Sequence, residues 1–345
     1  MENSAGSGEL SSRSSRVCLE QDAQPTITRN AIMPFNRKPK VFTPIGALSF
    51  GDGARAVTLG GGNTLPLCFF DAKPNNLPAV GVEITDTGFD TAGLPLLAAP
   101  YDGAVTLAER AVRAANLKGV DFVCLRFEGA DPGGLNRSAE DCAKLAQEVA
   151  AACPKPLCIA GCKNTEKDTE LFKALGTALQ EHNVLFLSAK EENYKTVGAA
   201  TALAYGHKVA AESAVDINLA KQLNILLTQL GVPKGSIVMN VGSAAAGYGF
   251  EYLSSVMDLV KAAALEQGDA MLQMPVITPV STEAWMVKES IVSQADMPEW
   301  GDVEQRGIQM ETATAAACLA SGSDAVILRH PVSIEKTAAL IAALV

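Results

Sequence analysis

Polar side chains stand at or just after the ends of eight short apolar segments of this sequence. They are mostly amides, carboxylates and lysines, and one loop among them is built from alanine, glycine and tyrosine. Small residues leave room for a flat ligand to lie against the backbone, where neighbouring polar groups can hydrogen-bond its edges. We take ten of these residues as candidate binding residues: Asn164, Asn193, Tyr194, Asp216, Asn218, Ala246, Gly247, Tyr248, Arg329 and His330.

The same positions lack the groups that several kinds of catalysis need. A Schiff-base aldolase needs a lysine deep inside a strand, but Lys190 falls where a turn begins, and the sixth segment offers only Asn240. A zinc hydrolase needs several histidines at strand ends, but His182 and His207 precede strands instead of following them. The G-x-S-x-G motif of serine hydrolases is missing. We therefore assign no catalytic residue and expect a surface that holds a ligand.

Eight cysteines raise the question of a metal centre. The spacing Cys153-x4-Cys158-x3-Cys162 is compatible with an iron–sulfur cluster. However, Cys158 and Cys162 lie at opposite ends of one expected strand, about 13 Å apart at ~3.3 Å per residue, which is too far for one small cluster. We expect reduced thiols, with Cys158 packed inside the fold, Cys153 at a helix end and Cys162 at the ligand-binding face, and we assign no metal ligand to this chain.

The elements that must position the candidate residues repeat eight times along the chain. Each unit is an apolar segment, a turn and a helical stretch. The apolar segments cover 79–86, 121–129, 156–162, 184–189, 208–216, 236–242, 274–280 and 325–331. Eight such units predict an α/β fold, a closed (β/α)8 TIM barrel over residues 79–345. Such a barrel places its functional groups in the loops after the strands.

Helix signals give some candidate residues an alternative, purely structural role. Thr106 and Glu109 form a capping-box pattern before a helix from Leu107, and apolar spacing predicts a helix over Ile217–Leu230 that ends at Gly231. Asp216 and Asn218 would then serve as helix caps. In the same way, His330 would be a structural imidazole, and the alanine- and glycine-rich loop would be a tight turn.

The N-terminal part differs in composition from the repeating units. Residues 1–33 are rich in serine, glycine, glutamine and asparagine, and we expect a disordered leader. Residues 34–78 are expected to form an arm and a β-hairpin, with Ala56–Leu59 and Pro66–Phe70 joined by the turn at 60–63. A hairpin there would suit a plug under the barrel floor.

Charge and hydropathy exclude two classes of partner. The chain has 345 residues and a formal net charge of −10, and an acidic protein repels the phosphate backbone of nucleic acids. No apolar run approaches the ~20 residues of a membrane span, and the first residues lack the apolar core of a secretory signal. We expect a soluble cytoplasmic protein.

Several long and unusual strings resemble one protein family. They are Ser188-Ala-Lys-Glu-Glu-Asn-Tyr-Lys195, Ser213-Ala-Val-Asp-Ile-Asn-Leu-Ala-Lys-Gln-Leu-Asn224, Ala246-Gly-Tyr-Gly-Phe-Glu-Tyr252, Met274-Pro-Val-Ile-Thr278, Glu283-Ala-Trp285 and Leu328-Arg-His-Pro331. They closely resemble the small subunit of the corrinoid iron–sulfur protein, whose archaeal relative is the delta subunit of the acetyl-CoA decarbonylase/synthase complex. The match runs from about residue 34 to the C-terminus, and nothing is carried over to residues 1–33.

The resemblance implies a non-catalytic subunit that carries methyl groups in the Wood–Ljungdahl pathway of acetyl-CoA synthesis and carbon fixation. It implies a heterodimer with a larger subunit that holds a [4Fe–4S] cluster and a mobile corrinoid domain, with cobalamin shared between that domain and the mouth of this barrel. Further partners implied are the methyltetrahydrofolate:corrinoid methyltransferase and CO dehydrogenase/acetyl-CoA synthase. The ten candidate residues would support the corrin and hydrogen-bond its amide side chains.

Two other functions fit the same barrel. A pterin-dependent methyltransferase also uses Asp and Asn at strand ends, and Asp216 and Asn218 could grip a pterin. A purely architectural subunit would need no functional residue at the mouth. Direct ligation of cobalt by this chain would oppose its reduction, so a mouth without a committed histidine ligand suits the methyl carrier.

Overall fold

Eight parallel strands form the centre of the computed structural model, which describes residues 42–65 and 76–344. The strands are β3 (Ala79–Thr85), β4 (Phe122–Arg126), β5 (Leu157–Ala160), β6 (Leu185–Ala189), β7 (Lys208–Glu212), β8 (Ile237–Asn240), β9 (Ile277–Pro279) and β10 (Ala325–Leu328). Each lies within one of the eight predicted apolar segments. They are buried on both faces, which explains why they read as continuous Val, Ile, Leu and Ala runs.

The sheet closes into a barrel. Its strand order is β8-β7-β6-β5-β4-β3-β10-β9, and every adjacent pair is parallel. The two outer strands meet through a bridge between Met239 and Val276, where the Met239 N–H donates to the Pro275 carbonyl at 2.8 Å. The (β/α)8 barrel predicted from the sequence is therefore confirmed.

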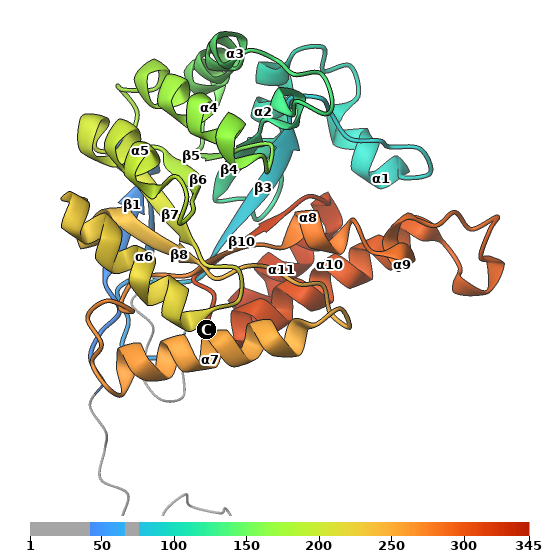
Figure 1. The fold of residues 1–345 in the computed structure, drawn as a ribbon. Coiled ribbons are helices and arrows are strands. Elements are labelled where there is room, and N and C mark those ends of the chain that lie inside the picture. The colour runs from blue at the N-terminus through green and yellow to red at the C-terminus, as the bar shows by residue number, and fades with distance from the viewer. Residues whose placement is uncertain (1–41, 66–75, 345) are drawn as a thin grey trace, which may run out of the picture. The chain divides into compact units, whose positions relative to one another are not determined.

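Helices surround the strands (Figure 1). The longer ones are α2 (Leu107–Ala115), α3 (Ala139–Ala152), α4 (Thr165–Ala178), α6 (Ile217–Leu230), α7 (Phe250–Leu265), α10 (Val303–Ala320) and α11 (Pro331–Leu344). The short ones are α1 (Pro95–Ala98), α5 (Tyr194–Gly198), which continues as a π-helix over Ala199–Leu203, α8 (Val280–Ala284) and α9 (Lys288–Ile291). Single 3-10 turns cover Gly53–Arg55, Ala99–Tyr101, Glu128–Ala130, Lys234–Ser236 and Pro298–Trp300.

Local sequence signals set several helix ends as predicted. Thr106 and Glu109 form the reciprocal capping box of α2, with Oγ1 and Oε2 each accepting the other residue's N–H. Helix α6 has the predicted bounds because the Asp216 carboxylate caps its start and Gly231, with φ of +107°, ends it in the left-handed region.

A two-stranded hairpin closes the amino-end floor of the barrel. It pairs β1 (Ala47–Phe50) with β2 (Val57–Gly60) in antiparallel register. The strand at 56–59 was foreseen, but it pairs with the segment before it, and Pro66–Phe70 lies outside the described residues. The ring of Phe50 meets that of Phe122 edge-on at 5.3 Å. Full burial of Phe50 stabilises the fold by roughly 1.5–3 kcal/mol.

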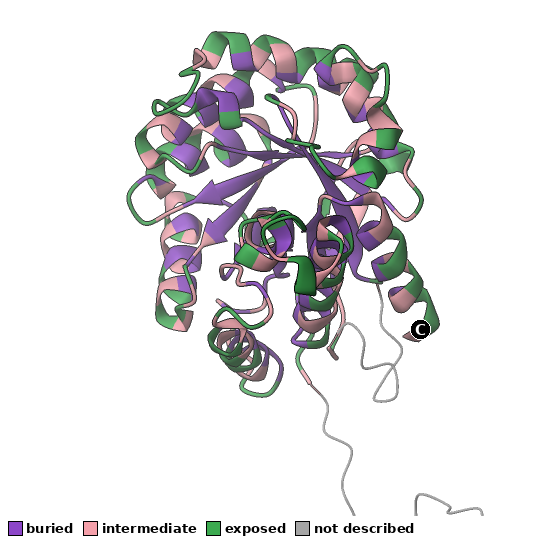
Figure 2. Cartoon of the chain, turned by 90° about the vertical axis from the view of Figure 1, so that its right-hand side faces the viewer, coloured by how far each residue is buried: buried purple, intermediate pink, exposed green. Residues whose placement is uncertain are grey.

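The strand pleat divides the core into two layers. Phe122, Cys124 and Cys158 face the inside of the barrel together with the hairpin, whereas Val123 and Leu125 face the helices. Figure 2 shows the barrel strands mostly buried and the outer helix faces exposed. The alternation continues to the carboxyl ends, where it turns Glu83 and Arg126 toward the barrel interior.

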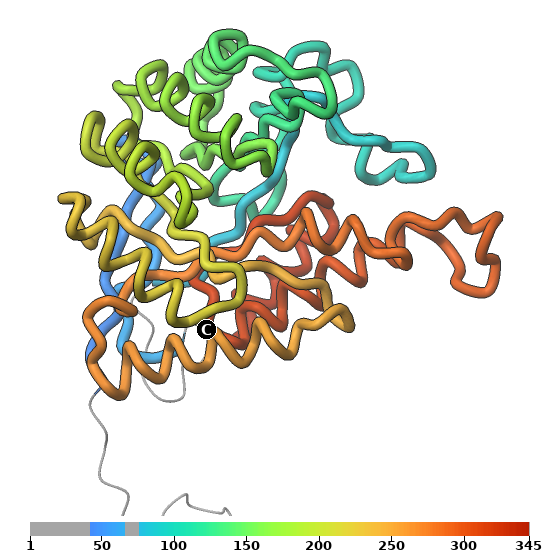
Figure 3. The backbone as a smooth tube through the Cα atoms, in the orientation of Figure 1, coloured from blue at the N-terminus to red at the C-terminus, as the bar shows by residue number. Residues whose placement is uncertain are grey.

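Two long connections project from the carboxyl end of the barrel. One follows β3 and contains α1, and the other follows β9 and contains α8 and α9. Figure 3 shows them on the same side of the molecule. The first of them contacts the first turn of α10, where the Leu97 N–H donates to Oε1 of Glu304 at 2.9 Å.

Candidate functional site

A cavity of about 210 Å³ opens where the barrel strands end. It is lined by the last residues of the strands and the first residues of the following loops. The lining residues are Arg126, Ala160, Gly161, Lys163, Asp168, Leu187, Ser188, Lys190, Glu212, Asn240, Gly242, Ser243, Pro279, Thr282 and Glu283. Position at the carboxyl ends of parallel strands makes this mouth the expected functional end of the barrel.

Glu83 is the centre of a buried charge cluster below the mouth. Its Oε2 accepts from Nε of Arg126 at 2.8 Å, and its Oε1 accepts from Nη2 of Arg329 at 2.9 Å. Burial alone would raise the pKa of Glu83, but the two guanidinium groups outweigh it and hold the pKa at about 2. Glu83 is therefore ionised at neutral pH and fixes both arginines.

Two further pairs of opposite charges line the mouth. Lys190 Nζ lies 3.4 Å from Glu212 Oε1, and Lys163 Nζ lies 3.5 Å from Glu283 Oε1. Asn240 donates through Nδ2 to Ser188 Oγ at 3.1 Å. Because these side chains are paired, they can form hydrogen bonds with a ligand, but none of them stands alone as a base or nucleophile.

Asp168 and Cys162 form a further pair at the edge of the cavity. Asp168 Oδ1 accepts from the Cys162 backbone N–H at 2.7 Å and from its Sγ at 3.2 Å. A Cβ on Gly161 would overlap the Asp168 carboxyl group in its present position, so glycine lets this carboxyl group approach the backbone. Burial raises the pKa of the Cys162 thiol to about 12, and the neighbouring carboxylate adds to this shift, so the thiol stays protonated.

Asn164, Asp216 and Asn218 lie at the starts of α4 and α6. The Asn164 side chain accepts from the Lys167 N–H and caps α4. Asp216 Oδ1 accepts from the backbone N–H groups of Asn218 and Leu219 at 2.7 and 3.1 Å. Asn218 itself lies exposed in the first turn of α6.

Asn193 and Tyr194 support the loop after β6. Asn193 is buried, with Oδ1 accepting from the Lys190 N–H at 2.8 Å and Nδ2 donating to Thr169 Oγ1 at 3.1 Å. Tyr194 begins α5 and packs, half-buried, against the core. Both hold the position of Lys190, which does line the cavity.

The loop after β8 carries three more candidates. The Ala246 N–H donates to Thr314 Oγ1 at 3.0 Å, and Gly247 has φ of +86° and no neighbour that a Cβ would meet. Tyr248 is 49% exposed and donates from its hydroxyl to Glu289 Oε2 at 2.5 Å. This contact joins the β8 loop to the α9 connection.

Arg329 and His330 follow the last strand directly and face different surroundings. Arg329 lies over the Phe89 ring at 4.2 Å and binds Glu83. His330 is fully buried, stacked on Trp285, with Nε2 3.2 Å from Glu304 Oε1 and Nδ1 accepting from the Val332 N–H. An acceptor at Nδ1 places the proton of the neutral ring on Nε2.

The ten candidates thus surround the mouth, and none of them is among the residues that line the described cavity. Their part in binding remains a prediction. Sequence reasoning missed Arg126, because it belongs to an apolar strand instead of a loop. The available signal was a pair of opposite charges, Glu83 and Arg126, at inward positions of adjacent strands, since buried charges need partners.

Exposed apolar side chains surround the mouth as well. Leu96 follows β3, Leu135 follows β4, Tyr248 follows β8, and Met286 and Ile291 follow β9. All five stand on connections at the carboxyl end. In the described part of the chain, no helix is long and apolar enough to cross a bilayer.

Comparison with known proteins assigns the chain to a family. The acetyl-CoA decarbonylase/synthase complex subunit delta of Archaeoglobus fulgidus is 31% identical over 303 residues, which cover 84% of this chain but 65% of that protein. The corresponding subunit of Methanopyrus kandleri is 30% identical over 84% of this chain and 72% of its own length. The chain therefore spans about two thirds of the length of these relatives.

A solved structure supports the fold alone. Dihydropteroate synthase from Xanthomonas albilineans superposes with a TM-score of 0.51 at 12% identity, over 86% of this chain and 98% of that one.

Residues 47–333 match the family model of the CO dehydrogenase/acetyl-CoA synthase delta subunit, which confirms the resemblance inferred from the sequence strings. Because this match covers most of the chain, the protein belongs to the CO dehydrogenase/acetyl-CoA synthase delta subunit family.

Proposed function

We propose that this chain is the small subunit of a corrinoid iron–sulfur protein and that its barrel mouth covers a cobalamin held by a larger subunit. The observation that carries the proposal is the self-paired mouth: its charged groups bind one another around a cavity of about 210 Å³. The names of the relatives, subunits delta of acetyl-CoA decarbonylase/synthase complexes, support the same system.

The donor groups at the mouth fit a cover that does not ligate cobalt. His330, the histidine at a strand end, has both ring nitrogens engaged inside the fold. The Cys162 thiol is held protonated beside Asp168, and Lys190 is paired with Glu212. Cobalamin would supply the cobalt atom that accepts the methyl group. This chain would offer that cobalt atom no strong ligand, so its lower oxidation states would stay accessible.

The size and edge of the mouth also fit a flat ligand lying across it. The cavity is smaller than the roughly 300–1,000 Å³ of pockets that enclose drug-sized ligands. Lys163, Glu283 and Ser243 stand at its edge as hydrogen-bonding partners for amide side chains. The apolar side chains on the surrounding connections would exclude water when a corrinoid domain docks.

In this proposal the cobalamin and a [4Fe–4S] cluster belong mainly to the larger subunit, which would pair with this chain as a heterodimer. The methyl group would come from a methyltetrahydrofolate:corrinoid methyltransferase and pass to CO dehydrogenase/acetyl-CoA synthase. The exposed candidates, such as Asn218 and Tyr248, would contact the corrin edge, and the buried ones, such as Asn193 and His330, would position the mouth loops.

Anaerobic co-purification tests the proposal. A tagged full-length chain should bring down a larger, cysteine-rich chain together with corrinoid absorbance. Recovery of a colourless chain that transfers methyl groups by itself would contradict it.

The alternative, a pterin-dependent methyltransferase, is favoured by the Asp168 carboxyl and Asn240 amide in a cavity of about the size of a bicyclic ring. A titration separates the two, because only the enzyme would bind methyltetrahydrofolate tightly as an isolated chain.

A further inference from the structure

A second and larger pocket lies outside the barrel, beside the carboxyl end of β3. Its volume is about 620 Å³, which falls within the range of small-molecule sites. It is enclosed by the end of β3, the α1 connection and the start of α2. It shares none of its lining residues with the mouth cavity.

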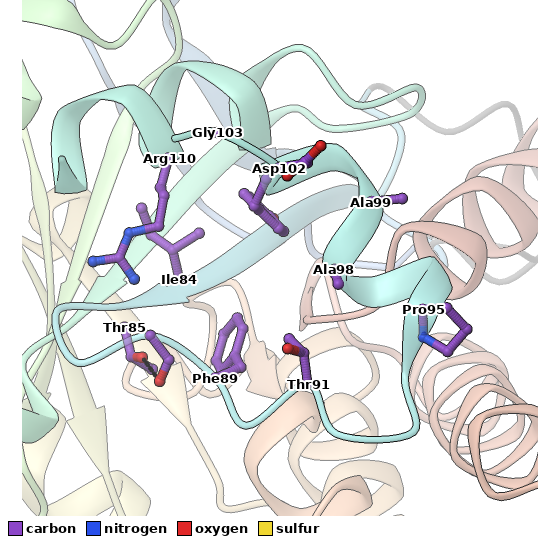
Figure 4. Close-up of a pocket in the computed structure, with 12 residues that line it drawn as sticks. Ile84, Thr85, Phe89, Thr91, Pro95, Ala98, Ala99, Asp102, Gly103 and Arg110 are labelled. Atoms are coloured by element: carbon purple, nitrogen blue, oxygen red, sulfur yellow. Dashed lines mark hydrogen bonds between the residues drawn. The ribbon is translucent and has the colours of Figure 1, made fainter. Parts of the chain in front are cut away.

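One end of this pocket carries the positive charge of Arg110, which belongs to α2. Among the described residues none accepts a hydrogen bond from its guanidinium or lies within ion-pair distance of it, and the Asp86 carboxylate attracts it only from farther away. Figure 4 shows this side chain extending past Ile84 toward Thr85. Gly88, with φ of +82°, makes room for it, because a Cβ there would lie 2.9 Å from Nη1.

The rest of the pocket is mainly apolar. Phe89 lies between Arg110 and the α1 wall, which is formed by Pro95 and Ala98 (Figure 4). The Arg329 guanidinium stacks on the Phe89 ring at 4.2 Å from its centroid, which helps to fix this wall. Tyr101 also lines the pocket, and its hydroxyl is buried without a hydrogen-bond partner among the described residues. A buried hydroxyl of this kind is costly unless a ligand or water pairs with it.

We propose that this pocket binds an organic monocarboxylate with an apolar or aromatic body. The carboxylate would pair with the Arg110 fork, and the body would lie against Phe89 and Ala98. A single guanidinium matches the charge and planar geometry of one carboxylate. A dianionic phosphate would bring excess negative charge near Asp102, which also lines the pocket. This inference does not depend on the proposed corrinoid function, because the mouth cavity is separate.

Ligand-observed NMR and calorimetry on the full-length chain test the inference. The probes are phenylacetate, its neutral analogue 2-phenylethanol, phenyl phosphate and acetate. Phenylacetate should bind more tightly than the other three, because acetate lacks the body and 2-phenylethanol lacks the charge. Arg110→Gln should weaken phenylacetate binding about tenfold to a hundredfold, as expected for loss of a charged hydrogen bond.

Two further variants keep the test specific. Ala98→Phe fills the pocket without changing its charge and should abolish binding. Lys173→Gln removes one positive charge from the outer face of α4, where the side chain is exposed, and should leave binding unchanged. The inference is overturned if phenylacetate does not bind, if the alcohol or phosphate ester binds as well as the acid, or if Arg110→Gln has no more effect than Lys173→Gln.

Discussion

The imidazole of His330 donates through Nε2 to Oε1 of Glu304 at 3.2 Å, and the same oxygen accepts the Leu97 N–H at 2.9 Å. This one carboxylate therefore ties the end of β10 to the α1 connection. The consequence for function is that His330 holds two mouth connections together and has no free nitrogen for a ligand.

Replacement of His330 should change stability and its dependence on pH. Burial lowers the pKa of His330 below its ordinary value of 6.5. Below that value the unfolded chain binds the proton more readily than the folded chain, so stability falls as the pH decreases through about 6.5. Wild type should melt earlier at pH 5.5 than at pH 7.5. His330→Gln should lower the melting temperature at both pH values and reduce the difference between them.

Burial also lowers the pKa of His207, so the variant should retain part of the pH dependence. Thermal melts of wild type, His330→Gln and His207→Gln across this pH range measure the two contributions. If His330→Gln showed the same difference in melting temperature between pH 5.5 and pH 7.5 as wild type, the lowered pKa of His330 would be contradicted.

Glu83 should be the most sensitive position in the mouth. Glu83→Gln leaves Arg126 and Arg329 buried without their anion, and loss of one partner of a buried ion pair costs about 3–5 kcal/mol. Chemical denaturation measures the loss. As a control, Glu335→Gln breaks the exposed pair with Lys118 and should cost about 1 kcal/mol or less.

The same substitution should alter the acid sensitivity of the fold. The pKa of Glu83 falls from an ordinary value of 4.5 to about 2 on folding. Its contribution to stability is complete above pH 4.5 and is lost as the pH falls through 2. The difference in unfolding free energy between wild type and Glu83→Gln should therefore shrink in that window. A constant difference from pH 7 to pH 2 would show that Glu83 is not held ionised.

Asp216 and Asn218 separate helix capping from ligand binding. Asp216→Ala removes the cap of α6 and should lower stability by about 1 kcal/mol. Asn218→Ala removes an exposed side chain and should leave stability nearly unchanged. If Asp216 instead grips a pterin, Asp216→Ala would abolish methyltetrahydrofolate binding, which a titration of the isolated chain would detect.

Tyr248 should matter for association more than for folding. It is half-exposed on the mouth side, and its hydroxyl binds Glu289 at 2.5 Å. Tyr248→Ala should weaken binding to the proposed corrinoid-bearing subunit by roughly tenfold, as at an aromatic interface position, and slow the proposed methyl transfer in the reconstituted pair. Leu259→Ala, in the middle of α7 and farther from the mouth loop, where Leu259 is 52% exposed, serves as the control. Equal effects of the two variants would argue against mouth docking.

The barrel could be predicted from the sequence because its signals are local. Continuous apolar segments give the strands, and caps such as Thr106 and Asp216 give the helix starts. The hairpin partner Ala47–Phe50 was not foreseen, since its register with Val57–Gly60 depends on packing under the barrel. The loops of the mouth were located correctly, but their contacts could not be derived.

The sequence could not predict in which direction the candidate side chains point or which residues they contact. Asn193 turns inward to Lys190 and Thr169, and His330 turns to Glu304 and Trp285. Residue type and spacing do not encode these directions, because they follow from which helices pack behind each strand. The side pocket at Arg110 depends on the path of the α1 connection, which has no periodic pattern.

Site-specific photo-crosslinking tests most directly which end of the barrel meets the proposed corrinoid-bearing subunit. A benzophenone side chain would replace Met286, which is 64% exposed on a mouth connection, or Leu203, which is 42% exposed before β7 at the opposite end. The proposal predicts a cross-link to the larger subunit from position 286 and none from position 203. Cross-linking from position 203 alone would contradict it.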